Sequence, residues 1–308
     1  MSHWTFDDMP DQSGRRAVVT GANTGIGFET ARALVRKGAH VTLACRNSEK
    51  GRRAIDRIRA EVTGASAFLE QLDLSDLDQV EAFASKYAAE NDRLDLLILN
   101  AGVMVPPASK TAQGFELQFG VNHLGHFALT GALLPLLQQT ESSRVVVVSS
   151  TAAVQAAIHF DDLQFETRGY APWPAYGQSK LANQLFAREL QRRLRAVGSS
   201  VLVTAAHPGW TVTDLQRTSS FARCLSPVFG MKPPQGALPT LRAATDPEAT
   251  GGEYFGPNGF FQMRGYPVRV EMVKRAKDDV TAKRLWAISE ELTGTYYGLP
   301  PVRPSGLA

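Results

Sequence analysis

The sequence predicts an α/β protein whose parallel sheet is covered by helices on both faces. Strand-like runs alternate with segments of helical period along most of the 308 residues. The runs are apolar and β-branched without polar alternation, which indicates strands buried on both sides, as in a parallel sheet. A glycine-rich turn separates the first strand from the first helix. Together these observations predict a βαβ protein of the doubly wound type.

The first half of the chain carries the clearest pattern. A strand over residues 17–20 is followed by a helix over about 25–37, which Gly38 ends, and by a second strand over 40–45. Hydrophobic period then distinguishes the next elements. They are a helix over 48–62, a strand over 67–72, a helix over 76–90 and a strand over 94–99.

The second half continues the alternation and gives seven expected strands in total. Its expected elements are a long helix over 115–137, a strand over 144–149, a helix over 174–196, a strand over 201–206, a helix over 235–244, a strand over 253–255 and a helix over 278–292. We expect a Rossmann-like, seven-stranded parallel sheet in one domain. An extension over about 1–14 precedes a core over 15–256, which includes a mobile substrate loop near 214–236 rich in Ser, Pro and Gly. A C-terminal extension over 257–308 carries one helix.

Composition excludes several classes of function. The formal net charge of +3 is spread along the chain, which argues against a nucleic-acid partner. No apolar run approaches the ~18 residues that a membrane-spanning helix requires, so we expect no integral membrane segment. Residues 1–8 do not resemble a secretory signal, and two cysteines, Cys45 and Cys224, make neither a disulfide framework nor a metal-ligand set. We expect a cytoplasmic protein without a metal.

The turn Thr20-Gly21-Ala22-Asn23-Thr24-Gly25-Ile26-Gly27 has the composition of a nucleotide-binding loop. Glycines permit a tight turn and the close approach of a pyrophosphate, and the N-terminus of the following helix offers amide donors to phosphates. Many glycine patterns are simple turns. Its place between a strand and a helix favours cofactor binding.

Tyr176 and Lys180 lie four residues apart in a predicted helix, so the phenol would lie beside the ammonium. A nearby positive charge favours the phenolate and lowers the pKa of a tyrosine from its usual value of about 10. Such a pair suits proton transfer. Any long helix can also carry this pair by chance.

The order of motifs resembles that of the short-chain dehydrogenase/reductase family, classical type. The loop spacing, with three residues between Gly21 and Gly25, is similar to that family's, as are Asn100-Ala101-Gly102 and the pair Tyr176 and Lys180. The resemblance implies catalytic roles for Asn122, Ser150, Tyr176 and Lys180. It implies cofactor contacts from Gly21, Asn23, Thr24, Gly25, Ile26, Gly27, Asp73, Leu74, Asn100, Ala101, Gly102, Tyr176, Lys180, Pro208, Gly209, Thr211 and Thr213.

Two departures from the family pattern are visible. Leu99 replaces the first of two usual asparagines, and we expect little effect because Asn100 keeps the sheet-stabilising role. The spacing from Ser150 to Tyr176 is about twice that of many members, because residues 152–174 form an insertion. This insertion resembles the retinol-dehydrogenase-like branch. Further support for that branch comes from Leu181-Ala182-Asn183, His207-Pro208-Gly209, Tyr254-Phe255-Gly256-Pro257 and Ser289-Glu290-Glu291-Leu292.

Arg46 predicts the choice of nicotinamide cofactor. NAD-preferring enzymes usually place an acidic residue at the end of the second strand, whereas this chain has Ala44-Cys45-Arg46. An arginine can bind a 2′-phosphate through two hydrogen bonds, so NADP(H) is expected in preference to NAD(H). The alternative is that Arg46 is a solvated charge at a strand end.

The family resemblance implies a hydride-transfer mechanism in which each of the four catalytic residues has a role. Tyr176 would donate a proton to the carbonyl oxygen, which Ser150 would hold. Lys180 would lower the pKa of the tyrosine and bind the nicotinamide ribose, and the Asn122 backbone would hold a water. Ser149 is the neighbouring candidate for the serine role, but adjacent strand residues point to opposite faces.

Other residues carry weaker hypotheses. His123 and His126 lack a carboxylate or cysteine at ligand spacing, so we expect packing or hydrogen-bonding roles rather than a metal. His207 is expected to be structural. Trp173 and Trp210 either line a substrate pocket or pack in the core, and Met104-Val105-Pro106 is a pocket candidate.

The sequence therefore predicts an NADP(H)-dependent oxidoreductase acting on CH–OH groups, with a small lipophilic carbonyl or alcohol as substrate. One alternative is a cofactor-binding sensor or scaffold without turnover. Another is an enzyme similar to light-dependent protochlorophyllide reductase. A methyltransferase is disfavoured because Arg46 stands where that fold usually has an acidic residue. A homo-oligomer is left open.

Overall fold

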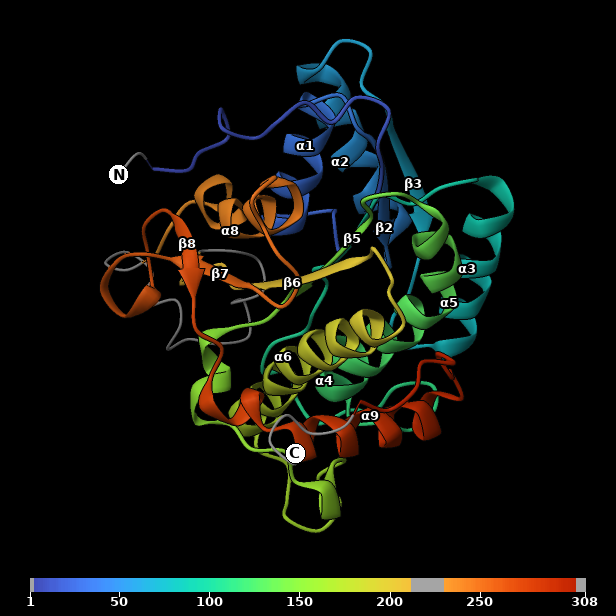
Figure 1. The fold of residues 1–308 in the computed structure, drawn as a ribbon, viewed down its shortest axis with the longest axis vertical. Coiled ribbons are helices and arrows are strands. Elements are labelled where there is room, and N and C mark those ends of the chain that lie inside the picture. The colour runs from blue at the N-terminus through green and yellow to red at the C-terminus, as the bar shows by residue number, and fades with distance from the viewer. Residues whose placement is uncertain (1–2, 212–229, 303–308) are drawn as a thin grey trace.

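A single eight-stranded sheet forms the centre of the protein (Figure 1). The computed structural model describes residues 3–211 and 230–302. The strand order is β3-β2-β1-β4-β5-β6-β7-β8, and the order reverses between β1 and β4. Strands β1 to β7 pair in parallel, while β8 runs antiparallel to β7. The structure confirms the doubly wound α/β fold and adds an eighth strand.

The elements agree closely with the predicted alternation. The strands are β1 Arg16–Thr20, β2 His40–Cys45, β3 Ala67–Gln71, β4 Leu96–Leu99, β5 Arg144–Val148, β6 Leu202–Ala206, β7 Tyr254–Pro257 and β8 Pro267–Val270. The α-helices are α1 Gly25–Arg36, α2 Ser48–Glu61, α3 Leu77–Glu90, α4 Leu117–Phe119, α5 Gly125–Gln139, α6 Pro172–Ala196, α8 Pro233–Thr245 and α9 Asp279–Thr293. Short 3-10 helices include Thr151–Gln155 and Phe160–Asp162.

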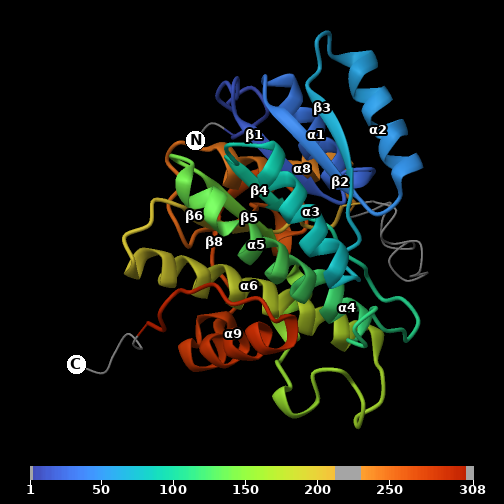
Figure 2. The same ribbon diagram turned by 90° about the vertical axis from the view of Figure 1, so that its right-hand side faces the viewer.

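Helices cover both faces of the sheet. The buried side chains of α1, α2 and α8 form one core with the strands, and those of α3, α5, α6 and α9 form the other. Figure 2 shows α9 outside α6, at the outer surface of the second layer. None of the helices in the two described ranges is both long and apolar enough to cross a membrane.

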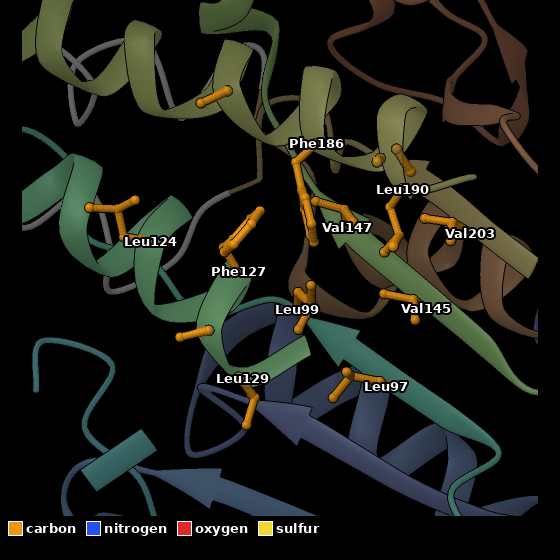
Figure 3. Close-up of a cluster of buried hydrophobic side chains, with 14 of the residues drawn as sticks. Leu97, Leu99, Leu124, Phe127, Leu129, Val145, Val147, Phe186, Leu190 and Val203 are labelled. Carbon is orange, nitrogen blue, oxygen red and sulfur yellow. The ribbon is translucent and has the colours of Figure 1, made fainter. Parts of the chain in front are cut away.

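Strand β4 shows why the strand sequences do not alternate with polar residues. Leu97 and Leu99 pack into one core and Leu96 and Ile98 into the other, and all four are fully buried. Figure 3 shows the first of these cores, where Leu97 and Leu99 face Phe127 of α5 and Phe186 of α6. A strand with apolar contacts on both faces needs an apolar side chain at every position.

The long helix expected over 115–137 is interrupted. Helix α4 ends at Phe119, and a π-helical turn over Gly120–Leu124 joins it to α5. Single π-helical turns are rare and often occur at functional sites. Within this turn the side chain of Asn122 is hydrogen-bonded to Val103 and Ser179, which both lie outside the turn.

The C-terminal part of the chain holds more structure than the one helix predicted. Strand β8 pairs with β7 from Tyr254 opposite Val270 to Pro257 opposite Pro267. Strand β8 therefore extends the main sheet beyond residue 256. The expected loop near 214–236 falls mostly outside the described residues, and its last part begins α8.

Candidate active site

A cavity of about 250 Å³ opens where the strand order reverses, beside the N-terminus of α1. In doubly wound folds this is the place where nucleotides bind. Fifteen of the expected cofactor-binding residues line it: Gly21, Asn23, Thr24, Gly25, Ile26, Gly27, Arg46, Asp73, Leu74, Asn100, Ala101, Gly102, Tyr176, Lys180 and Pro208. Sequence reasoning missed Ala44, Leu72, Val103, Val121, Val148 and Ser149 as lining residues, although most of them end or follow a strand.

At two positions of the loop the surrounding atoms leave room only for glycine. Gly21 has a φ of +66°, and a Cβ there would lie 2.9 Å from the Cα of Ala101. A Cβ on Gly27 would lie 2.5 Å from the carbonyl oxygen of Gly21. Neither position accepts a side chain without a backbone shift. The loop therefore fits the tight turn and close helix packing that a dinucleotide phosphate site requires.

The turn after β4 is bound to the end of β1. The Asn100 side chain donates from Nδ2 to the carbonyl oxygen of Thr20 at 2.8 Å. The Thr20 hydroxyl accepts hydrogen bonds from the backbone N–H groups of Asn100 and Ala101, both at 2.9 Å. Asn100 thus joins two strands of the sheet, while Leu99 before it is fully buried in the core.

Arg46 follows β2 and is exposed at the cavity. Within the described parts of the chain no carboxylate lies within ion-pair distance of its guanidinium. Because the side chain is charged, accessible and free of an acidic partner there, it can bind an anionic group in the cavity.

Tyr176 lies between two cavities and is buried. The Ser150 side chain is hydrogen-bonded to its phenol. The Nζ of Lys180 lies 5.8 Å from the centroid of the Tyr176 ring and donates to the Val148 carbonyl oxygen at 3.2 Å. Ser149 points elsewhere, since its hydroxyl donates to the Lys180 carbonyl oxygen at 2.7 Å. Both serines follow the end of β5, and their side chains make different contacts.

The protonation of this pair differs from the expectation. Burial raises the pKa of Tyr176 to about 12, and the hydrogen bond from Ser150 only partly opposes this. Burial also lowers the pKa of Lys180 to about 8. Burial, which disfavours the phenolate, is the largest influence on the pKa of Tyr176 here, and the expected lowering by Lys180 is not seen in this structure. At pH 7 the pair is a neutral phenol beside an ammonium.

Asn122 holds the π-helical turn in place and lines neither cavity. Its Oδ1 accepts from the Val103 backbone N–H at 2.8 Å, and its Nδ2 donates to the Val103 carbonyl oxygen at 3.0 Å. Nδ2 also donates to the Ser179 hydroxyl at 2.9 Å. The side chain thus joins the segment after β4 to α6, which leaves only the backbone of Asn122 for the expected contact with water.

A second cavity of about 840 Å³ adjoins the first and shares Ile26, Ser149, Tyr176 and Pro208 with it. Its volume suits a small organic molecule. Gly209 and Thr211 line this second cavity rather than the first, and Thr213 lies outside the described residues. Its other lining residues include Ser150 and the apolar or aromatic side chains of Met104, Val154, Trp173 and Trp210, whereas Val105 and Pro106 are absent from its walls.

The insertion over 152–174 forms one wall of the second cavity. Gln178 of α6 binds it at three points, since it donates to the Leu163 carbonyl oxygen at 3.0 Å and accepts from the His159 N–H at 3.3 Å and from Arg168 at 3.0 Å. Arg168 also lies 3.5 Å from an oxygen of Asp162. Arg168 is the one arginine among the described residues that line the cavity, and Asp162 neutralises its positive charge.

Three buried histidines make hydrogen bonds inside the fold. His126 binds Thr20 and the Asn122 backbone, His123 binds Ser289, and His207 binds Gln262. Among residues 3–211 and 230–302, no group of three or more His, Cys, Asp and Glu side chains could hold a metal ion. The hydrogen-bonding roles expected for His123 and His126 are therefore observed.

The fold, the glycine loop and the Tyr176 site together define a nucleotide-dependent oxidoreductase. The family model described as "short chain dehydrogenase" matches residues 15–223, so the chain belongs to that family. It lies in the retinol-dehydrogenase-like branch. Mouse retinol dehydrogenase 12 is 45% identical over 288 residues, which cover 91% of this chain and 87% of that protein.

Solved structures agree with this assignment. An uncharacterized protein from Mycobacterium paratuberculosis has a TM-score of 0.81 and 43% identity over 97% of this chain and 100% of its own. A protein from Shigella flexneri 2a, described as a short chain dehydrogenase and solved in complex with NADP, has a TM-score of 0.63 and 27% identity over 79% of this chain and 96% of its own. A nicotinamide cofactor is thus indicated for the family of this chain.

Proposed function

We propose that this protein is an NADP(H)-dependent oxidoreductase that interconverts a carbonyl and an alcohol of a small lipophilic substrate. The observation that carries the proposal is the position of Tyr176, which lines both the nucleotide cavity and the second, largely apolar cavity. A proton donor between the two sites can act on a substrate oxygen while the substrate carbon faces the cofactor.

The residues of the first cavity fit the cofactor. The N-terminus of α1 and the Gly21 turn would hold the pyrophosphate, Asp73 and Leu74 the adenine ring, and Arg46 the 2′-phosphate. Support for NADP(H) comes from the exposed Arg46 and from the NADP complex of the Shigella protein. When bound, the reduced nicotinamide supplies the hydride.

The residues of the second cavity would move the proton. Tyr176 is a neutral phenol at pH 7, so it can donate a proton to an oxygen that gains negative charge. The Ser150 hydroxyl lines the same cavity and would donate a second hydrogen bond to that oxygen. Lys180 would hold the ribose, and the Asn122 backbone carbonyl would bind a water that returns the proton to Tyr176.

Aromatic and aliphatic lining residues favour a lipophilic substrate. Met104, Val154, Trp173 and Trp210 contribute apolar surface to the cavity. The guanidinium among its described walls, that of Arg168, is paired with Asp162. A retinal-like aldehyde, another aldehyde or a ketone fits this chemistry better than an acid does.

The test compares wild type with Tyr176→Phe. We expect wild type to oxidise NADPH with at least one of retinal, medium-chain aldehydes, steroid ketones and quinones, in darkness. The variant should bind NADPH with similar affinity but turn over roughly 10²- to 10⁴-fold more slowly, the usual contribution of a general acid.

Two results would contradict the proposal. If both proteins bind NADPH and neither reduces any of these compounds, a sensor or scaffold role is favoured. If turnover requires light, the protein resembles protochlorophyllide reductase in its chemistry. Binding is measured by NADPH fluorescence, so it is scored independently of turnover.

A further inference from the structure

His126 of α5 is fully engaged by two groups of the candidate active site. Its Nδ1 lies 3.0 Å from the backbone carbonyl oxygen of Asn122, and its Nε2 lies 2.9 Å from the hydroxyl of Thr20. The ring is only 1% exposed, and Thr20 and Asn122 are fully buried. The ring is thus shielded from bulk solvent.

The contacts determine which tautomer the ring adopts. A carbonyl oxygen can only accept, so Nδ1 must carry the proton and donate to Asn122. Nε2 is then an acceptor in the neutral ring. The Thr20 hydroxyl lies 2.9 Å from Nε2 and 3.3 Å from the carbonyl oxygen of Ile98, so its proton has two acceptors, of which the ring nitrogen is the nearer. Burial lowers the pKa of His126 to about 4, which keeps the ring neutral at physiological pH.

Thr20 extends this connection to the nucleotide cavity. Its oxygen accepts from the N–H groups of Asn100 and Ala101, both at 2.9 Å. Asn100 and Ala101 line the nucleotide cavity, whereas Asn122 belongs to the π-helical turn. One imidazole therefore joins a wall of the cofactor site to the backbone that the proposed mechanism uses for proton return.

We propose that His126 is a positioning residue with two separable roles. Its Nδ1–H orients the Asn122 carbonyl for proton return, and its Nε2 holds Thr20 and thereby the Asn100–Ala101 wall of the nucleotide cavity. The first role rests on the proposed function. The second concerns cofactor binding alone, so it is testable even if turnover is never found.

Two substitutions separate these roles. In His126→Asn the amide takes the place of Nδ1 and keeps a donor for Asn122, but it does not reach Thr20. In His126→Gln the longer side chain takes the place of Nε2 and keeps the contact with Thr20. A side-chain amide offers both a donor and an acceptor, so each variant preserves one bond and loses the other.

We expect opposite effects on two constants. His126→Asn should keep kcat within about twofold while the Kd for NADPH rises roughly tenfold, the order expected for one lost hydrogen bond in a buried network. His126→Gln should keep the Kd for NADPH but lose roughly tenfold in kcat.

His123→Asn is the matched control. His123 is equally buried on the same helical segment, but its Nε2 binds the hydroxyl of Ser289 of α9 at 2.9 Å, away from both cavities. This control should lose stability in urea unfolding, as the His126 variants do, without altering kcat or the Kd for NADPH. If His126→Asn and His126→Gln change both constants equally, His126 only packs, and the proposal is overturned.

A measurement on the wild type is independent of all variants and of activity. Nitrogen-15 NMR of the imidazole groups distinguishes a protonated from an unprotonated ring nitrogen. We expect one buried histidine with a protonated Nδ1 and an unprotonated Nε2 that stay unchanged between pH 5.5 and 9, as His126 requires. The opposite tautomer at His126, assigned by its loss in His126→Gln, would overturn the proposal.

Discussion

Arg46 is the residue whose charge sets the expected cofactor preference. It follows β2 at the nucleotide cavity and is exposed, so its guanidinium can meet a 2′-phosphate with two hydrogen bonds. An aspartate at the same place would repel that phosphate and accept from a ribose hydroxyl instead.

Arg46→Asp should therefore shift preference from NADPH toward NADH. Charge-assisted hydrogen bonds contribute about 1.5–3 kcal/mol each, so the ratio of kcat/KM values for the two cofactors should fall at least roughly tenfold. Arg53→Asp is a matched control, because Arg53 is an exposed arginine of α2 paired with Glu49. Equal use of NADPH and NADH by the wild type would contradict the assignment of Arg46.

Residue types and their spacing predicted most of the side chains that line the nucleotide cavity, but not their protonation. The glycine loop, Arg46, Tyr176 and Lys180 were all found from motifs. The pKa of Tyr176 was not, because it depends on how completely the phenol is buried, and burial is a property of the whole fold.

At the scale of elements, the insertion between β5 and α6 is held by Gln178. This side chain is fully buried and binds Leu163, Arg168 and the His159 backbone. The bound segment forms a wall of the second cavity, which Trp173 and Pro174 also line. The insertion therefore has a fixed shape, which the sequence could not show because all three partners precede Gln178 by several residues in irregular structure.

Gln178→Leu should loosen this wall without affecting the nucleotide cavity. We expect KM for the best aldehyde to rise several-fold, because one leucine cannot replace three hydrogen bonds worth about 1 kcal/mol each. The affinity for NADPH should stay unchanged. Gln138→Leu, which alters an exposed glutamine of α5, is the control. A variant with wild-type KM for every substrate would show that the insertion does not shape the cavity.

Helix α9 is attached to the second layer through an aromatic cluster. Trp286 lies with its ring centroid 5.2 Å from that of Phe127 and 4.6 Å from that of Tyr297, and Arg193 lies 4.4 Å above its ring. Tyr297 donates from its hydroxyl to the Phe127 carbonyl oxygen at 2.6 Å. The C-terminal part of the chain is thus integrated into the core.

Trp286→Ala should lower the free energy of unfolding by about 3–5 kcal/mol, the usual cost of removing a large buried aromatic side chain. Urea unfolding followed by circular dichroism measures this change. Tyr296→Ala, at a side chain that is 72% exposed, should shift the same free energy by less than about 0.5 kcal/mol. Equal effects of the two variants would mean that α9 contributes nothing to the core.

Local pattern predicted nearly every strand and helix, since each strand is a distinct apolar run. It did not predict the π-helical turn over Gly120–Leu124 or β8. Both depend on partners remote in sequence: Asn122 binds Val103 and Ser179, and β8 is a strand only because β7 lies beside it. Periodicity within one segment contains no information on such partners.

The whole molecule has a buried set of neutral histidines that links its stability to pH. Burial lowers the pKa values of His123, His126 and His207 to about 3, about 4 and about 4. Between these values and the unfolded value of about 6.5, the unfolded chain binds protons that the folded protein does not.

The free energy of unfolding should therefore fall as the pH drops from 6.5 toward 4. Each such histidine contributes a slope of at most about 1.4 kcal/mol per pH unit in this window, and none above about pH 7. Urea unfolding at pH 7, 6 and 5 measures the slope, and His123→Asn should reduce it. A free energy that stays constant across these pH values would mean that the three rings are protonated in the folded state.

At this scale the fold class and the family were accessible from the sequence because strand and helix patterns alternate, and because the glycine loop, Asn100-Ala101-Gly102 and the pair Tyr176 and Lys180 occur in the order of the family. The single-domain organisation with its boundaries, the cytoplasmic location and a homo-oligomer stay predictions. A local sequence pattern does not determine these properties, because they depend on the contacts that the folded surface makes and on the cell that holds the protein.

The two edge strands of the sheet, β3 and β8, affect the tendency of the protein to aggregate at high concentration. An edge strand with free backbone groups can pair with a strand of another molecule, which is a route to aggregation. At one end, β8 begins with Pro267, which has no N–H to offer, and carries Arg269 in an ion pair with Glu253 at 2.6 Å. At the other end, β3 is five residues long and carries Glu70 in an ion pair with Lys86 at 2.7 Å. Both edge strands are short and carry a charged side chain, and β8 also begins with a proline. These features disfavour the pairing of either edge with a strand of another molecule.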